Sequence, residues 1–194
     1  MKNKIILSLV TSCFISSVAM ADFYVGLEYG AAKSEAQGEA AGYDSVTIDN
    51  NYKDIKLKIG TGSDGEFKFQ AGLSFISLDE KLFDDSNSDL IEISVDAIKE
   101  FEVTKEFYPF LKAGVGVGSM SVEGYTEESI VEISFNVGAG VSYKAVEHLY
   151  LIAGVDYVGR KWQDIEYQTG FLSTVTLSVT ESGFKPYVGV NYQF

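Results

Sequence analysis

The sequence has little from which a metal centre or a thiol site could be built. It contains one cysteine and one histidine in 194 residues, which excludes a site of clustered histidines or thiolates. Prolines number only two and 46% of the residues are hydrophobic, so the composition excludes a disordered chain. No apolar run of about 18 residues follows residue 21, which excludes a transmembrane helix there. We expect no cofactor and no metal.

Positive charge is also scarce. Lys and Arg number 15 against 28 Asp and Glu, and without Lys2 and Lys4 the balance is 13 against 28, a formal charge of −15. A surface of this sign repels nucleic acid, so nucleic acid is excluded as a partner. Glycine (19), phenylalanine (13) and tyrosine (12) are plentiful instead, and this composition favours β-barrels over helical bundles.

The first 21 residues have the pattern of a secretory signal peptide. A basic start is followed by a mostly apolar run, Ile5 to Val18, and by the small-residue cleavage site Ala19-Met20-Ala21. We therefore expect residues 1–21 to be removed and residues 22–194 to form one domain. An alternative lipoprotein cleavage before Cys13 is disfavoured because the apolar run that precedes it is short. Whether Cys13 is ever lipidated stays open.

The rest of the chain repeats a period of two. At residues 184–194, apolar side chains alternate with polar or small ones over the about 9–11 residues that a transmembrane β-strand needs. In residues 174–194 as a whole, Val179 and its apolar neighbours are out of phase with Val188, and a β-bulge near Ser182-Gly183 would restore the register. The same alternation predicts strands at residues 23–31, 55–61, 67–75, 91–97, 111–118, 131–143, 149–157 and 174–194.

The connections between these strands alternate between long and short. The long ones are residues 32–51, 79–89, 119–128 and 159–173. Outer-membrane barrels have short periplasmic turns and longer extracellular loops, so this order places the long segments outside. The sequence thus predicts an all-β fold, an eight-stranded antiparallel up-and-down transmembrane β-barrel.

Alternation alone does not tell which face meets lipid, because a soluble periplasmic barrel that binds a ligand inside would show the same pattern. Two features favour apolar residues outside. Glycines such as Gly72, Gly116 and Gly138 keep step with the charged residues, and inside a narrow barrel glycine makes room for long side chains opposite. Aromatic residues gather near strand ends on the apolar face, as in the girdles at lipid–water boundaries. The soluble barrel stays an alternative.

The polar face then lines the interior. Because an eight-stranded barrel is just wide enough for its own side chains, we expect a plugged interior crossed by paired charges. The alternative is a small gated pore for ions or small solutes. The predicted interior network consists of Glu28, Lys56, Lys58, Lys68, Glu92, Asp96, Lys112, Glu132, Asp156, Arg160 and Lys185.

The excess negative charge falls in the long connections. The clearest acidic loop holds Asp79, Glu80, Asp84, Asp85 and Asp89, as a candidate contact for a cation or a partner. Divalent ions bridging to lipopolysaccharide phosphates, or an adhesive surface, would use it; the alternative is a solvated loop without a ligand. Residues 84–89 lack the glycine and final glutamate of an EF-hand, which disfavours a specific calcium site.

Catalytic residues are missing from the expected positions. Some eight-stranded barrels act on lipid A through a histidine paired with a serine and an acid. Here His148 lies in a predicted periplasmic turn and is followed by Leu149-Tyr150, at the end of the barrel opposite to the outer leaflet. We therefore expect a protein that is not an enzyme.

With these strands in place, the chain resembles the small outer-membrane β-barrel family, which includes the transmembrane domain of outer-membrane protein A and the opacity-type, porin-like surface proteins. The likeness is carried by Phe23–Gly26, Pro109–Gly116 and Tyr187–Phe194. The last segment resembles the terminal assembly signal of such barrels, with Val188, Val190, Tyr192 and Phe194 read by the barrel-assembly machinery.

The resemblance implies a location in the bacterial outer membrane, with lipid and lipopolysaccharide as neighbours. It implies a role in envelope structure or adhesion, with a host or extracellular ligand bound through the loops. The sequence stops at Phe194, without the peptidoglycan-binding domain that follows the barrel in outer-membrane protein A, which puts wall anchoring in doubt. The ligand, conductance and oligomeric state are left open.

Overall fold

In the computed structural model of the chain, residues 23–40, 44–80, 82–83, 88–122, 129–168 and 174–194 are described. They form ten β-strands joined in one sheet. No helix in these residues is long and apolar enough to cross a membrane. The predicted signal peptide lies outside them. The strands are β1 (Phe23–Ala40), β2 (Val46–Asp49), β3 (Tyr52–Thr61), β4 (Phe67–Leu78), β5 (Asp89–Glu100), β6 (Phe107–Ser121), β7 (Ser129–Val146), β8 (Leu149–Trp162), β9 (Ile165–Gln168) and β10 (Thr174–Gln193).

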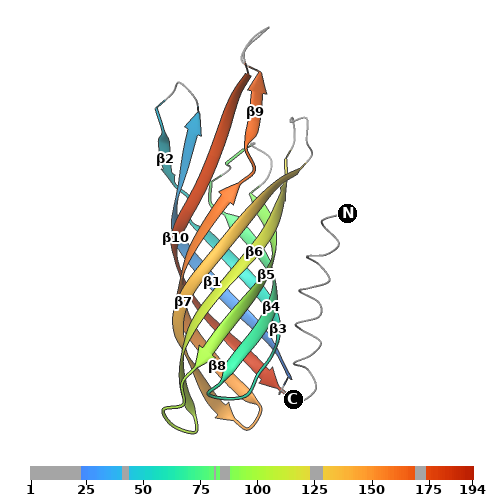
Figure 1. Ribbon diagram of the computed structural model, residues 1–194, viewed down its shortest axis with the longest axis vertical. Helices are drawn as coiled ribbons and strands as arrows, with labels where there is room; N and C mark the ends of the chain where they lie inside the picture. Colours follow the sequence, from blue (N-terminus) through green and yellow to red (C-terminus); the bar gives the residue numbers. More distant parts are fainter. Residues whose placement is uncertain (1–22, 41–43, 81, 84–87, 123–128, 169–173) are drawn as a thin grey trace.

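Eight of the strands close into a barrel (Figure 1). They pair antiparallel in the order β1-β3-β4-β5-β6-β7-β8-β10, and β10 pairs back with β1. The predicted eight-stranded up-and-down barrel is therefore confirmed. The short strands β2 and β9 pair with the far ends of β1 and β10, beyond the closed part.

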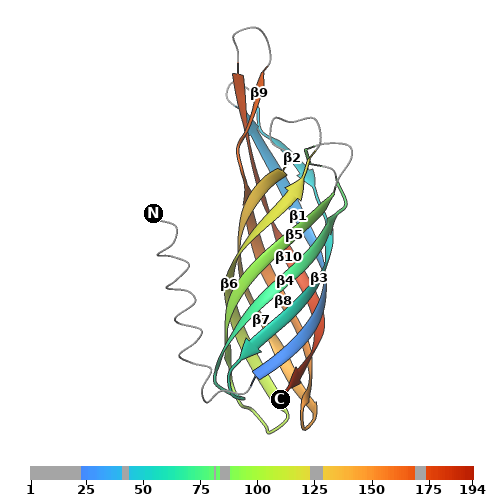
Figure 2. The same cartoon turned by 90° about the vertical axis from the view of Figure 1, so that its right-hand side faces the viewer.

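The two ends of the barrel differ in shape. The short connections at residues 62–66, 101–106 and 147–148 lie at the same end as the C-terminus, whereas β1, β2, β9 and β10 rise beyond the other strands at the opposite end (Figures 1 and 2). Short turns mark the periplasmic side of an outer-membrane barrel. The tall extension therefore lies on the extracellular side.

Side chains alternate between an apolar outer face and a polar interior. Val115 is 58% exposed and Ile133 65% exposed on the outside, whereas Asp156 is 0% and Glu132 1% exposed. Aromatic side chains edge the apolar band, with Phe23 and Phe67 near the periplasmic end. A soluble barrel with its apolar residues around an enclosed centre is therefore wrong for this chain, because those residues face outward.

The predicted loop at residues 32–51 is wrong over most of its length. β1 continues to Ala40 and pairs with β10 without a change of register, from Lys33 opposite Phe184 to Ala40 opposite Leu177. In this part of β1, small residues such as Ala36 point inward and charged residues point outward. The two-residue period therefore persists, but the apolar residues, which face outward in the first part of the strand, are now on the inner face. The same holds for residues 159–173, where β8 runs on to Trp162 and β9 follows.

The predicted bulge near Ser182-Gly183 is also wrong. β10 keeps one register against β8 from Thr180 to Tyr192. Val179 does not face lipid but points inward, 6% exposed, because the interior at this height is apolar. The register shift in the barrel lies instead in β7, between Lys144 and Val146.

The interior is built in three layers. The extracellular layer is apolar and includes Tyr52, Leu90, Met120, Trp162 and Val179. The middle layer contains the charged residues. The periplasmic layer is mostly aromatic, and its members are Ile98, Tyr108, Phe110, Tyr150, Ile152 and Tyr187. Apolar layers thus cover the charged layer at both ends, which the simple rule of apolar outside and polar inside does not predict.

Candidate functional site

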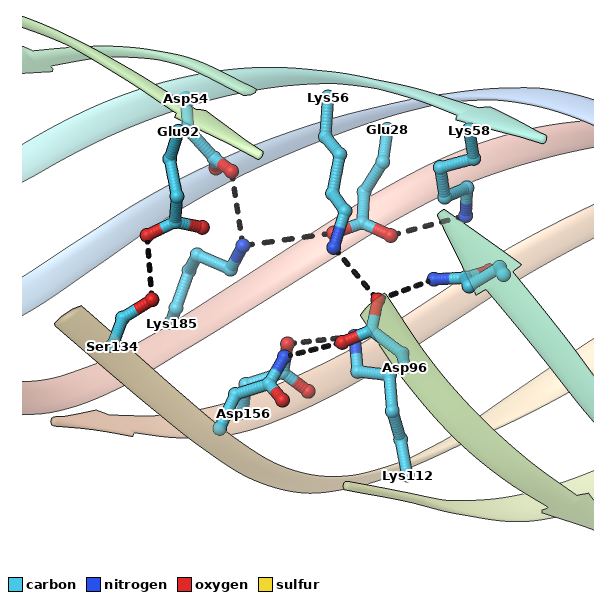
Figure 3. A network of polar contacts seen from close by, with 12 residues as sticks. Glu28, Asp54, Lys56, Lys58, Glu92, Asp96, Lys112, Ser134, Asp156 and Lys185 are labelled. Atoms are coloured by element: carbon cyan, nitrogen blue, oxygen red, sulfur yellow. Dashed lines mark hydrogen bonds and ion pairs between the residues drawn. The ribbon is translucent and has the colours of Figure 1, made fainter. Parts of the chain in front are cut away.

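The charged residues predicted to line the interior all lie there. They come from all eight barrel strands, so the network joins segments far apart in the sequence (Figure 3). Each is at most 8% exposed: Glu28, Lys56, Lys58, Lys68, Glu92, Asp96, Lys112, Glu132, Asp156, Arg160 and Lys185. A buried charge is costly unless it is paired, so the pairing decides whether this layer is stable.

Asp96 gathers three donors at the middle of the network (Figure 3). Lys56 Nζ and Gln70 Nε2 each lie 2.8 Å from Asp96 Oδ2. Asn136 Nδ2 donates to the other oxygen of this carboxylate at 2.9 Å. Tyr24 extends the chain of contacts, since its hydroxyl donates to Gln70 Oε1 at 3.0 Å. These contacts tie β1, β3, β4, β5 and β7 together across the interior.

Glu28 lies between two lysines from different strands (Figure 3). Its carboxylate is 3.1 Å from Lys58 Nζ and 3.6 Å from Lys185 Nζ. Lys185 also pairs with Asp54 at 2.9 Å. The positive charges of Lys58 and Lys185 are therefore balanced by two carboxylates within the layer, where water does not screen them.

Lys112 and Asp156 form the shortest ion pair of the described residues, at 2.7 Å, with both side chains at most 2% exposed. The ammonium group also lies 4.2 Å from the centre of the Tyr187 ring, a cation–π contact. Gly138 makes this possible, because a Cβ there would lie 2.1 Å from Asp156 Oδ1. Glycine thus makes room for a long side chain opposite.

Arg160 is the cation of an acidic cluster below the extracellular apolar layer. Its guanidinium lies 3.6 Å from Glu92 and 3.7 Å from Glu181, and 4.3 Å from the centre of the Tyr52 ring. Glu132 is buried beside Glu92 and Arg160. Three carboxyl groups therefore surround one guanidinium.

A turn closes the periplasmic end. Asp64, in the connection between β3 and β4, accepts a hydrogen bond from the Tyr150 hydroxyl at 2.6 Å and ion-pairs with Lys68 at 3.1 Å and Lys144 at 3.3 Å. Lys68 also pairs with Glu100 at 2.9 Å. Burial alone would raise the pKa of Asp64, but the Tyr150 hydrogen bond and the Lys68 charge outweigh burial and hold this pKa below its ordinary value.

These contacts leave little open space in the interior. Two hollows among the ion pairs measure about 20 Å³ each, which is room for about one water molecule apiece. In the part of the chain that the structure describes, no group of three or more His, Cys, Asp or Glu side chains could hold a metal ion. Among the described residues, the charged layer is therefore closely packed.

Sequence reasoning missed several members of this network. Asp54, Glu100 and Glu181 are buried and ion-paired. Asp54 and Glu100 lie just outside expected strands, and Glu181 lies next to the bulge that was expected near Ser182-Gly183. The two-residue period could have identified them, since Asp54 faces the same side of its strand as Lys56, and Glu181 the same side as Lys185. Asp64 gave no such signal, because it is brought inside by a turn.

The predicted acidic loop is only partly described. Asp79 and Glu80 are exposed just after β4, and Asp89 is exposed at the start of β5. Asp84 and Asp85 lie outside the described residues. Glu80 is held in place by its backbone N–H, which donates to Asn50 Oδ1 at 3.2 Å.

The predicted assembly signal lies on the outer face of β10. Val188 is 59% exposed, Tyr192 46% and Phe194 67%, and Val190, on the same face, is half-buried. The rings of Tyr192 and Phe194 pack edge-on at 5.2 Å, and Phe194 lies 6.0 Å from Phe23. Reading of these residues by an assembly machinery stays a prediction.

Comparison with protein families decides the classification. The sequence profile described as outer membrane protein beta-barrel domain matches residues 5–194. The chain belongs to this family. As a member of the outer membrane protein beta-barrel family, it is a bacterial outer-membrane protein that sits in lipid, as the sequence predicted. Comparison with the sequences of curated proteins gives no match.

Solved structures share the fold of this family member at low identity. Neisserial surface protein A (NspA) is 19% identical, covers 89% of this chain and 97% of its own, and gives a TM-score of 0.55. OprG of Pseudomonas aeruginosa is 13% identical, with 90% and 96% coverage and a TM-score of 0.55. The outer membrane protein AlkL, solved in lipid bilayers, is 12% identical, with 90% coverage of both chains and a TM-score of 0.54.

Proposed function

We propose that the protein is a non-enzymatic outer-membrane barrel that displays acidic segments at the cell surface, in envelope structure or adhesion. The observation that carries this proposal is the filled interior. Ion pairs such as Lys112–Asp156 occupy the middle, and apolar layers cover both ends. With the interior closed, the surface left for contact with partners is the extracellular extension.

That extension is acidic. Exposed carboxylates lie on both its strands and its connections, and few lysines accompany them. They are Glu35, Glu39, Asp44, Asp49, Asp79, Glu80, Asp89 and Asp164. A surface of this sign favours partners of positive charge, or lipopolysaccharide phosphates bridged by divalent cations. The proposed partners are therefore a host or extracellular ligand, lipopolysaccharide and, during insertion, the barrel-assembly machinery.

The position of His148 supports a role without catalysis. This residue lies in the periplasmic turn between β7 and β8, and its Nδ1 is 2.9 Å from the carbonyl oxygen of Gln193. A catalytic histidine needs a nucleophile or an acid within hydrogen-bond reach, and here the ring contacts a backbone carbonyl and, at 5.9 Å, the ring of Tyr192.

A small gated pore is the second candidate. NspA and OprG share the fold, and fold does not settle function. The observation in favour is the continuous set of charged groups in the middle layer. Opening would require both apolar layers and the Asp64 turn to move.

Adherence of bacteria that produce the protein tests the proposal. Replacing Asp79, Glu80 and Asp89 by Asn, Gln and Asn should reduce adherence to host cells or to a positively charged surface. The matched control replaces Glu102 and Glu106, two exposed carboxylates of the periplasmic turn, by Gln and should change nothing. Equal adherence of all three strains, or none above a strain without the protein, would contradict the adhesive role.

A further inference from the structure

Two glutamates from different strands meet inside the barrel, over β6. Glu92 on β5 and Glu132 on β7 lie opposite Gly118 of β6, one on each side. A Cβ on Gly118 would lie 2.4 Å from Glu132 Oε1, and a Cβ on Gly116 would lie 3.0 Å from Glu92 Cδ. The two glycines therefore leave the space in which these carboxyl groups come together, and Glu92 is the hydrogen-bond neighbour of Glu132.

The charged and titratable groups around this pair come from four other strands and from β5. They are Arg160 on β8, Glu181 on β10, Tyr52 on β3, and the ion pairs Lys56–Asp96 and Lys185–Asp54, whose lysines line a hollow shared with Glu92. Each of the two lysines already has its own carboxylate. Among these groups, the Arg160 guanidinium is therefore the single cation for three carboxyl groups, those of Glu92, Glu132 and Glu181.

Glu132 is the carboxyl group of this cluster that receives no hydrogen bond. Ser134 Oγ donates to Glu92 Oε2 at 2.9 Å, and Ser34 Oγ donates to Glu181 Oε1 at 2.7 Å. In the part of the chain that the structure describes, neither oxygen of Glu132 has a hydrogen-bond partner, although this residue is 1% exposed. Because two ionised carboxylates can only accept, Glu132 and Glu92 can bond to each other only when one of them carries a proton.

Apolar side chains cover the pair on the extracellular side. The next row across β5, β6 and β7 is Leu90–Met120–Ile130, and its members are at most 3% exposed. Trp162, which lies opposite Glu132 on β8, is 1% exposed. An ionised, unpartnered carboxylate is costly at such a depth, which favours the neutral acid.

We propose that Glu132 is a carboxylic acid at neutral pH and donates its proton to Glu92, so that closure of the extracellular apolar layer depends on pH. When the pH rises and this proton leaves to water, two adjacent carboxylates remain beneath the layer and repel each other. The layer is then less stable. The inference needs no ligand or partner, so it is independent of the proposed role of the surface.

Carboxyl carbon NMR measures this proton directly. The full mature chain, with its glutamate carboxyl carbons labelled, is folded into lipid nanodiscs, and the Glu132 signal is assigned by its loss in Glu132→Gln. At neutral pH we expect the chemical shift of a protonated acid for Glu132 and that of a carboxylate for Glu35, which is exposed. A carboxylate shift for Glu132 at neutral pH would overturn the proposal.

Urea titration in lipid vesicles measures the consequence for stability. An unfolded glutamate is ionised above about pH 5, so a folded chain that keeps the proton releases it on unfolding and becomes less stable as the pH rises. From about pH 5 to about pH 7, the unfolding equilibrium constant of the unchanged protein should therefore rise about tenfold more per pH unit than that of Glu132→Gln. Glutamine keeps the shape and a donor toward Glu92 but has no proton to release.

Glu35→Gln is the matched control, because Glu35 is an exposed carboxylate on the outer face of β1. It should keep the pH dependence of the unchanged protein. Equal pH dependence of Glu132→Gln and the unchanged protein, or the same loss in Glu35→Gln, would contradict a proton held by Glu132.

Discussion

Neighbouring residues of a spanning strand face opposite environments. In β6, Val115 is 58% exposed toward the membrane while Lys112, three residues earlier, is 5% exposed inside. The two side chains therefore lie in different surroundings. Val115 faces the hydrocarbon of the membrane, and Lys112 lies in the packed charged layer. Substitutions at the two kinds of position should fail for different reasons.

Val115→Arg tests the outward face. An arginine near the bilayer centre should lower the free energy of unfolding by about 2–4 kcal/mol, measured by urea titration in lipid vesicles. Val103→Arg is the control, since Val103 is 64% exposed in a periplasmic turn and its substitution should be close to neutral. A neutral Val115→Arg would mean that this face does not meet acyl chains.

Lys112→Met tests the charged layer. It leaves Asp156 buried without its cation, which should cost about 3–5 kcal/mol in the same titration. The double variant Lys112→Met/Asp156→Leu should recover much of this loss because no lone charge remains. Lys99→Met is the control, since its partner Glu66 has a side chain 71% exposed and surface pairs contribute about 0–1 kcal/mol. Equal losses for Lys112→Met and Lys99→Met would contradict the packed layer.

Asp64 gives a prediction for pH. Its folded-state pKa lies below the ordinary value, so its contribution to stability is complete above the unfolded pKa of about 3.9 and is lost as the pH falls through the folded pKa. Asp64→Asn should therefore make stability less dependent on pH below about 4. Unfolding titrations at several pH values check this, with Glu66→Gln as the control. An unchanged acid limb in Asp64→Asn would show that the turn does not hold the periplasmic end.

At the scale of the strands, the period of two predicted the eight strands of the barrel and which face is apolar in its middle, but it did not predict the short strands β2 and β9. It did not predict where strands end. β1 and β8 run on through polar sequence because pairing with β10 satisfies their backbone, and Ala36 or Trp162 can point inward without meeting lipid. The interior is also apolar near both ends of the barrel. Val179 is out of phase with Val188 because it points into this apolar interior, and no bulge is needed.

Gly154→Val tests the spacing between strands. A Cβ at Gly154 would lie 2.6 Å from the Tyr187 ring and 2.9 Å from a backbone carbonyl of β7, so the larger side chain should overpack the periplasmic layer at a cost of about 1–3 kcal/mol. Ala153→Val, the adjacent outward position, should cost little. Thermal unfolding of the two variants in detergent measures the difference. Equal melting temperatures would mean that the interior has room to spare.

At the scale of the molecule, the site was predictable in kind but not in detail. The alternation of charged residues on all strands indicated a paired interior, and every predicted member is buried. Which residues pair could not be read from the sequence, because pairs such as Lys185–Asp54 join strands 131 positions apart. The Asp64 turn depends on how the chain folds back, which local patterns do not contain.

Conductance in a planar lipid bilayer tests the central claim, that the barrel interior is closed and the protein acts through its surface. The full mature chain is inserted after its folding has been verified by gel mobility. A filled interior predicts no stable conductance steps above the bare membrane at voltages of either sign. Reproducible unitary currents that vanish when Lys112 or Asp96 is replaced would show that ions pass through the charged layer, and would contradict the account.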